Sequence, residues 1–335
     1  MRFFLILLFF FFLNLNAFSQ GCCSGGAGSP IAGGASTGVL SEYQMEISLN
    51  YQVNKSDQFY NEDVKSTPLF ENLSTDYLFF RTDYGVSKKL TLSLATGYYL
   101  NKELIETDNV DTTSTSGLSD LIILPRYSIY NKNINFKRTE IALGFGIKIP
   151  LASPNDSSVS IPSSSWNPSD IYQMNPPTVQ TTNGSHDFMF YSFFYRDYQK
   201  NKLRFFVSTL YIKKSFNSLG VKFGDYSSIG FFASKTFLRK WGVTTQLKAE
   251  RIGQIQAAEN IDLLGFYNIE PISTGSKKWF FIPQISYSSN GFTFFATGEL
   301  PVYQYLNGTQ IGSESQLTFG INYRFLIKES EDPIM

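Results

Sequence analysis

The final strand-like segment of the chain, residues 316–325, alternates apolar and polar side chains. Its apolar side chains share one face: Leu317, Phe319, Ile321, Tyr323 and Phe325. Its polar positions share the other: Gln316, Thr318, Gly320, Asn322 and Arg324. Successive side chains of a β-strand point to opposite faces. This pattern is therefore typical of a strand in a transmembrane β-barrel, with an apolar outside and a polar interior.

Similar segments recur along the whole chain. The strands that we predict cover residues 39–53, 74–86, 89–101, 118–130, 136–149, 186–198, 202–214, 225–238, 241–255, 278–288, 291–303 and 315–327. Segment 225–238 alternates poorly, because Phe231 and Phe232 are adjacent and Lys235 shares a face with Phe231. There are twelve segments, and an even number is expected of a single-chain bacterial barrel. The sequence therefore predicts an all-β fold: a transmembrane antiparallel up-and-down β-barrel.

The connections between these segments alternate between short and long. The short ones are residues 87–88, 131–135, 199–201, 239–240 and 289–290, and Asn290-Gly291 is a strong hairpin signal. The long ones are residues 54–73, 102–117, 150–185, 215–224, 256–277 and 304–314. Short periplasmic turns and long outer loops follow this order in outer-membrane barrels, whereas a soluble β-sandwich has no reason to keep it.

The N-terminus carries an export signal. Arg2 precedes an unbroken apolar run over residues 3–13, and Ala17-Phe18-Ser19 resembles a cleavage site. The run is too short to span a bilayer as a helix. We therefore predict a signal peptide over residues 1–19, a periplasmic segment over 20–38, the barrel over 39–327 and a periplasmic tail over 328–335. The expected location is the outer membrane of a Gram-negative bacterium, and outer-membrane lipids are the expected surroundings.

The segment before the first strand, residues 20–38, is rich in glycine and almost free of charge. Gly-rich chain is flexible, so this segment could thread the interior as a plug. It contains the chain's two cysteines, Cys22 and Cys23. Three interpretations remain open: a vicinal disulfide, a soft-metal site for an ion such as Cu(I), or pairing or lipidation outside the chain.

The charges give no sign of a nucleic-acid partner, because 28 basic side chains balance 28 acidic ones. The charged side chains that our assignments place in the lumen are Glu46, Arg81, Asp83, Asp120, Arg126, Glu140, Lys148, Arg196, Lys248, Glu250, Glu299 and Arg324. They could form a charged constriction that tunes permeation. Equally, they could form mutual ion pairs that fill and stiffen a narrow barrel.

Enzyme chemistry is poorly supported. The single histidine, His186, lies between Ser185 and Asp187 in sequence, which is not a triad. No CxxC, HExxH, phosphate-loop or EF-hand motif occurs. We therefore predict a non-enzyme without a cofactor. Two alternatives stay open: a lipid-modifying barrel enzyme that would pair His186 with a serine, and a closed barrel that acts as a structural or surface-recognition module. The proline-rich connection 150–185 is a candidate gate.

Two resemblances sharpen these expectations. Residues 318–325, TFGINYRF, resemble the terminal-strand signal of outer-membrane barrels, which implies recognition by the barrel-assembly machinery. The stretches GLSDL at 117–121, PRY at 125–127 and GFGIKIP at 144–150 resemble the outer-membrane transporter family of the meta-pathway of phenol degradation, itself distantly similar to long-chain fatty-acid transporters. The resemblance implies a channel that passes small hydrophobic or aromatic solutes. No energy-coupling domain is visible, so we expect diffusion.

Overall fold

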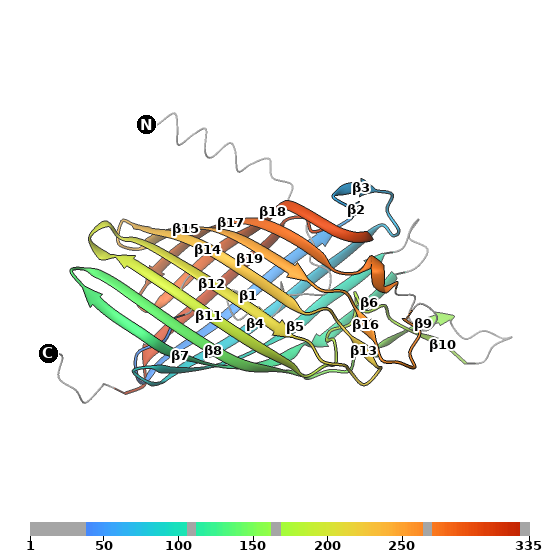
Figure 1. The fold of residues 1–335 in the computed structure, drawn as a ribbon, viewed down its shortest axis with the longest axis horizontal. Coiled ribbons are helices and arrows are strands. Elements are labelled where there is room, and N and C mark those ends of the chain that lie inside the picture. The colour runs from blue at the N-terminus through green and yellow to red at the C-terminus, as the bar shows by residue number, and fades with distance from the viewer. Residues whose placement is uncertain (1–37, 106–111, 162–168, 264–269, 329–335) are drawn as a thin grey trace.

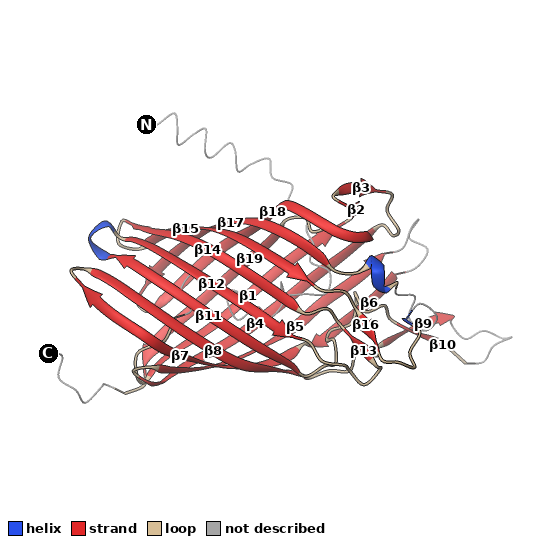
Figure 2. Ribbon diagram, in the orientation of Figure 1, coloured by secondary structure: helices blue, strands red, loops and turns tan. Residues whose placement is uncertain are grey.

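A computed structural model describes residues 38–105, 112–161, 169–263 and 270–328 (Figure 1). Most of this chain forms one closed antiparallel β-barrel, which Figure 2 shows as a tube of tilted strands. Its long strands are β1 (Gln44–Ser56), β4 (Asn72–Ser87), β5 (Leu90–Ile105), β7 (Asp120–Ile134), β8 (Lys137–Pro150), β11 (Asp187–Tyr198), β12 (Leu203–Lys213), β14 (Tyr226–Phe237), β15 (Trp241–Ile252), β17 (Ser276–Ser289), β18 (Phe292–Ile311) and β19 (Gln316–Leu326). Each long strand pairs with the next, and β1 closes the barrel against β19. The predicted barrel of twelve strands is confirmed.

Smaller elements gather at one end of the barrel, at the right in Figure 1. The short strands are β2 (Phe59–Glu62), β3 (Val64–Ser66), β6 (Thr112–Leu118), β9 (Ser157–Ile161), β10 (Ile171–Met174), β13 (Val221–Lys222) and β16 (Gln256–Ala257). The β2–β3 hairpin extends β18, β6 pairs with β5, and β9–β10 and β13–β16 form separate two-stranded sheets. We call this end the loop end. Of the 3₁₀ helices, η4 (Pro271–Ser273) lies here, whereas η3 (Gln199–Asn201) caps a turn at the opposite end.

Tight turns join the strands at that opposite end, which we call the turn end. Asn135 and Phe136 have φ of 50° and 60°, and Asn290 and Gly291 have φ of 52° and 81°. Two consecutive residues of positive φ form the hairpin turn whose twist matches that of the flanking strands. The hairpin predicted at Asn290-Gly291 is therefore present, and short and long connections lie at opposite ends.

The distribution of side chains is inverted relative to a soluble domain. Large apolar residues such as Phe80, Phe145 and Phe319 are exposed on the outward face. Polar residues such as Ser48 and Asn50 are completely buried on the inward face. This arrangement is typical of barrels that face lipid. No helix in the described part of the chain is long and apolar enough to cross a membrane.

Strand β11 faces the opposite way from our prediction. We expected Arg196 in the lumen, but it lies on the outward face with Phe194, and its guanidinium sits 5.6 Å from the ring of Tyr198. The inward side chains are Met189, Tyr191, Phe193 and Tyr195. Both faces of this strand are therefore aromatic. Side-chain polarity shows which face of a strand points inward only when the two faces differ in polarity. The two faces of β11 do not differ, so the sequence could not predict its orientation.

The structure also orients β14, whose sequence alternates poorly. Phe231 points outward and Phe232 inward, where its ring stacks on that of Phe206 at 4.1 Å between centroids. Lys235 shares the outward face with Phe231, but it lies near the turn end, with its ammonium 5.5 Å from the ring of Phe237. A lysine at a strand end can extend its charge towards water while its stem covers apolar surface. The segment alternates poorly because its inward face, like its outward face, carries an aromatic ring.

The predicted signal peptide and nearly all of the glycine-rich segment, including Cys22 and Cys23, lie outside the described residues. The same is true of the predicted tail after Lys328.

Candidate functional site: the barrel interior

A first group of charges lies on the inward faces of four strands in one part of the wall, β19, β1, β4 and β7. The Arg81 guanidinium contacts Glu46 Oε1 at 3.1 Å and Asp83 Oδ2 at 2.9 Å, and Arg126 Nη2 contacts Asp83 Oδ1 at 2.8 Å. Arg324 Nε donates a hydrogen bond of 2.7 Å to Glu46 Oε2 from the other side. These contacts follow from register, because Glu46 lies opposite both Asp83 on β4 and Arg324 on β19. The group is a continuous chain of ion pairs.

A second group lies towards the loop end. Lys148 Nζ is 2.6 Å from Asp120 Oδ2 and 3.7 Å from Asp187 Oδ2, and Lys214 Nζ is 2.8 Å from the same Asp187 oxygen. Burial, followed by the nearby Lys148 charge, lowers the pKa of Lys214 to about 8. Sequence reasoning did not select Asp187 or Lys214, because both lie at the edges of their predicted strands.

A third group joins β15 to β18. Lys248 Nζ contacts Glu299 Oε1 at 2.6 Å and Glu250 Oε2 at 3.3 Å. The Tyr226 hydroxyl donates to Glu250 Oε2 at 3.2 Å. Glu140, another of the selected residues, accepts from Arg138 and from the backbone N–H of Val39.

Apart from Arg196, the charged side chains selected from sequence face the interior, and each has an opposite charge within ion-pair distance. This geometry matches the interpretation as mutual ion pairs. Lone charges in a poorly hydrated interior would be costly, whereas paired ones hold neighbouring strands together. A role in selecting solutes stays a prediction.

The inward faces of β4, β5, β7, β8, β11, β12 and β14 form what we call the packed side. Its side chains make one apolar cluster with many aromatic rings: Tyr77, Phe79, Ala95, Tyr99, Ile122, Leu124, Ala142, Met189, Tyr191, Phe193, Phe206, Leu210, Ile212, Tyr226 and Phe232. Tyr77 and Tyr99 lie 4.6 Å apart between ring centroids. Much of the barrel wall is therefore lined inside, as well as outside, by apolar side chains, and the ion pairs of Arg81, Asp83 and Arg126 lie beside them.

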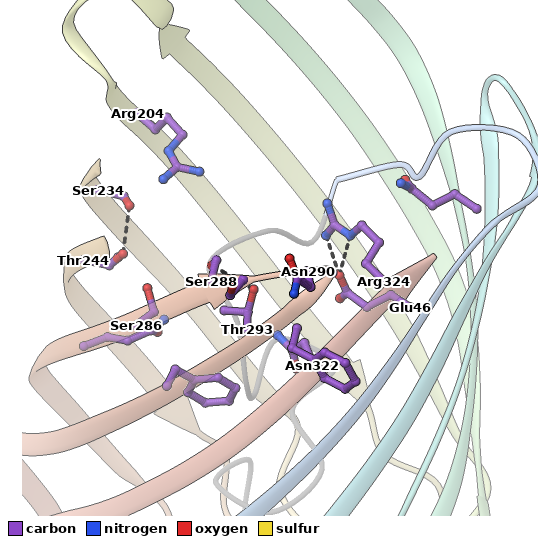
Figure 3. A pocket seen from close by; sticks show the side chains of 16 residues that line it. Glu46, Arg204, Ser234, Thr244, Ser286, Ser288, Asn290, Thr293, Asn322 and Arg324 are labelled. Carbon is purple, nitrogen blue, oxygen red and sulfur yellow. Dashed lines mark hydrogen bonds and ion pairs between the residues drawn. The ribbon is translucent and has the colours of Figure 1, made fainter. Parts of the chain in front are cut away.

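The inward faces of β15, β17, β18 and β19 form the open side. At its turn end lies a cavity of about 500 Å³ (Figure 3). Its polar lining is mainly hydroxyl and amide groups, from Ser234, Thr244, Gln284, Ser286, Ser288, Ser289, Asn290, Thr293 and Asn322. Glu46, Arg204 and Arg324 supply the charges, and Figure 3 shows the Glu46–Arg324 ion pair beside the cavity. The lining suits water or a polar solute.

A second cavity, of about 650 Å³, lies at the loop end and has a more apolar lining. Phe59, Phe70, Phe223, Ile255 and Ile311 contribute to it. The interior therefore has space at both ends.

The first described residues of the chain lie inside the barrel. Arg126 Nη1 donates to the Gly38 carbonyl at 2.9 Å, Val39 N donates to Glu140 Oε1 at 2.8 Å, and Leu40 N donates to Thr91 Oγ1 at 2.8 Å. Val39 packs on the aromatic cluster. The first strand therefore begins at Gln44 rather than at the predicted Val39.

The residues considered for catalysis do not form a triad. His186 is exposed, and the Ser185 hydroxyl donates to Asp187 Oδ1 at 2.7 Å. Asp187 in turn is held by Lys214. Within the described ranges, no group of three or more His, Cys, Asp or Glu side chains could hold a metal ion.

Comparison with solved structures places the fold among outer-membrane barrels. An outer membrane channel from Pseudomonas putida F1 is similar, with a TM-score of 0.60 and 10% identity over 87% of this chain and 99% of that chain. A FadL homologue from Pseudomonas aeruginosa has a TM-score of 0.41 and 8% identity over 85% of this chain and 90% of that one. The KdgM porin has a TM-score of 0.38 and 9% identity over 83% and 99%.

At 10% identity the likeness to the Pseudomonas putida channel is one of fold. No protein-family model matches this sequence, and no curated protein has a sequence that matches it. The resemblance to the phenol-pathway transporter family therefore stays a prediction.

Proposed function

We propose that this protein is an outer-membrane channel that passes small, mainly apolar or aromatic solutes by diffusion. The observation that carries the proposal is a closed barrel with an apolar outside and cavities at both ends of its interior. The fold that it shares with the Pseudomonas putida outer membrane channel supports the same reading.

The interior suits a solute with an apolar body. Aromatic side chains line the cavity at the loop end, and hydroxyl groups line the cavity at the turn end. A ring can pack against the aromatic wall, whereas its polar group can be hydrated on the open side. Ion pairs already satisfy the selected interior charges, so they would not hold an ionic solute strongly.

In this proposal the turn end faces the periplasm and the loop end faces the outside, because short turns are periplasmic in barrels of this class. The glycine-rich segment 20–37 is then a candidate plug. Its support is the position of Gly38, which is hydrogen-bonded to Arg126 in the interior. Loop 150–185 remains a second candidate gate.

The test is solute flux through purified protein refolded in liposomes. We compare the chain from residue 20 with a variant that lacks residues 20–37, using phenol and a sugar of similar size as solutes. Phenol flux above that of empty liposomes is expected from the intact protein, with higher flux after truncation. Failure of both forms to pass any solute would contradict the channel, and would favour a closed barrel that acts through its loops.

A further inference from the structure

The cavity at the loop end has a wall of aromatic and aliphatic side chains. Phe59 and Phe70 meet edge to face, with ring centroids 4.7 Å apart and planes at 81°. Phe223, Ile255 and Ile311 extend this wall. The volume of about 650 Å³ lies within the usual range of small-molecule sites. Such a wall favours the apolar body of a ligand.

A buried lysine lies in the same lining. Lys278 is on β17, is 2% exposed, and donates through Nζ to Ser313 Oγ at 2.8 Å. An ammonium has three donors, and a serine hydroxyl that accepts one bond can still donate another. Lys278 therefore presents a donor at a cavity whose wall is mainly apolar, and the Ser313 hydroxyl lies beside its ammonium.

Lys278 differs from the other buried cations of the described residues. Arg81, Arg126 and Lys214 are the remaining cationic side chains that are less than a tenth exposed. Each of them contacts a carboxylate within 3.1 Å. Lys278 Nζ donates to Ser313 Oγ, and it forms no ion pair with a carboxylate of the described residues.

The nearby acids are engaged elsewhere. Glu250 lies opposite Lys278 in the strand register, but its carboxylate contacts Lys248 and accepts from the Tyr226 hydroxyl. Glu270 also lines the cavity, but it is exposed and accepts from Ser273 Oγ at 2.7 Å. A buried cation without a counter-charge is unfavourable, so an anionic group from outside the chain would complete the site.

We infer that the loop-end cavity binds small aromatic monocarboxylates, with the carboxylate on Lys278 and Ser313 and the ring against Phe59, Phe70 and Phe223. The inference rests on the proposed function, since it makes this cavity the place where a solute is first captured. It also narrows the solute class, from apolar molecules in general to those that carry one carboxylate.

The experiment compares two probes of the same shape, 3-phenylpropanoate and the neutral 3-phenylpropanol. Binding of each is measured by isothermal titration calorimetry to the chain from residue 20 in lipid nanodiscs. The acid should bind about tenfold more tightly than the alcohol or better, because a charge-assisted hydrogen bond to a buried ammonium is lost with the alcohol. Equal affinities would overturn the inference.

Two lysine variants then locate the charge. Lys278→Met should remove the preference for the acid and leave the affinity of the alcohol unchanged. Lys277→Met is the matched control, because Lys277 is the adjacent residue, exposed on the outward face. An unchanged preference in Lys278→Met, or an equal loss in both variants, would contradict the site.

Further measurements guard against misfolding and separate this inference from the channel itself. Retention of the compact form on an unheated denaturing gel checks that each variant is folded. Lys278→Arg keeps the charge and should retain the preference for the acid. Phe70→Ala should weaken the binding of both probes. Phenol flux in liposomes without binding of 3-phenylpropanoate would contradict the carboxylate site alone. Binding of 3-phenylpropanoate without phenol flux would contradict the channel alone.

Discussion

The inward faces of β11 and β12 and those of β17 and β19 have the same strand geometry, but their side chains differ. On the first pair, the rings of Phe193 and Phe206 pack 5.8 Å apart within a continuous apolar cluster. On the second pair, Ser286 and Asn322 line a cavity of about 500 Å³. One side of the interior therefore resembles the core of a soluble protein, and the other side holds a cavity with a polar lining.

In the proposed channel, this difference separates the side chains that stabilise the barrel from those that would line the path of a solute. Close-packed side chains lose contacts when they are truncated, so the packed side should determine how stable the barrel is. Hydroxyl groups around a cavity can exchange protein partners for water, so substitutions on the open side should be tolerated. The predictions below test whether the two sides differ in this way.

The largest contrast is expected between two arginines that bind the same carboxylate. Arg81 on the packed side is 1% exposed, whereas the Arg324 side chain beside the cavity is 36% exposed, and both contact Glu46. Arg81→Met should lower the free energy of unfolding by about 3–5 kcal/mol, because it leaves buried Glu46 and Asp83 charges poorly compensated. Arg324→Met should cost about 1 kcal/mol or less. Urea titration in lipid vesicles measures both, and similar losses would remove the distinction between the sides.

A second contrast concerns packing without charge. Phe206→Ala should cost about 3–5 kcal/mol, because it leaves a void beside Phe232 and Phe193. Thr244→Val removes the hydroxyl that donates to Ser234 Oγ at 2.9 Å beside the open cavity. Water can replace that partner, so the expected loss is about 1 kcal/mol. The same urea titration applies, and a larger loss for Thr244→Val would show that the open side also carries the fold.

Two inward glycines test the space available. A Cβ at Gly146 on β8 would come within 2.5 Å of the Ile123 backbone oxygen, which cannot move away alone. A Cβ at Gly242 on β15 would meet only the Ser286 side chain, whose Oγ can rotate. Gly146→Ala should therefore cost about 1–3 kcal/mol through overpacking, and Gly242→Ala about 0.5 kcal/mol or less. Thermal unfolding followed by circular dichroism ranks the two, and the reverse order would contradict the geometry.

A separate effect is expected in the pH dependence of stability, at the loop end of the packed side. The pKa of Lys214 is lowered to about 8 in the folded protein, against about 10.4 for an unperturbed lysine. Between these values the unfolded chain binds more protons than the folded one, so stability should rise as the pH rises through this window. Lys214→Met should reduce that rise. Urea titrations of both proteins across the window supply the comparison, and parallel pH profiles would exclude a contribution from Lys214.

Much of the architecture was readable from the sequence. The strand segments, the alternation of short and long connections and the Asn290-Gly291 turn follow from local patterns, because period-two polarity and turn residues act over a few positions. The orientation of β11, with Arg196 outward, was not readable. Its inward neighbours Tyr191 and Phe193 are as apolar as its outward ones, so polarity could not distinguish the faces.

The sequence by itself determined that the chain closes a barrel with an apolar outside, and that most of the selected charges face inward. Only the tertiary structure decided which charges meet, where the interior is packed, and where cavities remain. Glu46 reaches Arg324 over 278 positions of sequence because β1 closes against β19. Among the described residues Lys278 has no carboxylate partner, and Glu250, opposite it in register, is held by Lys248 and Tyr226 instead. Such partners depend on strand register around the whole barrel, which no local pattern contains.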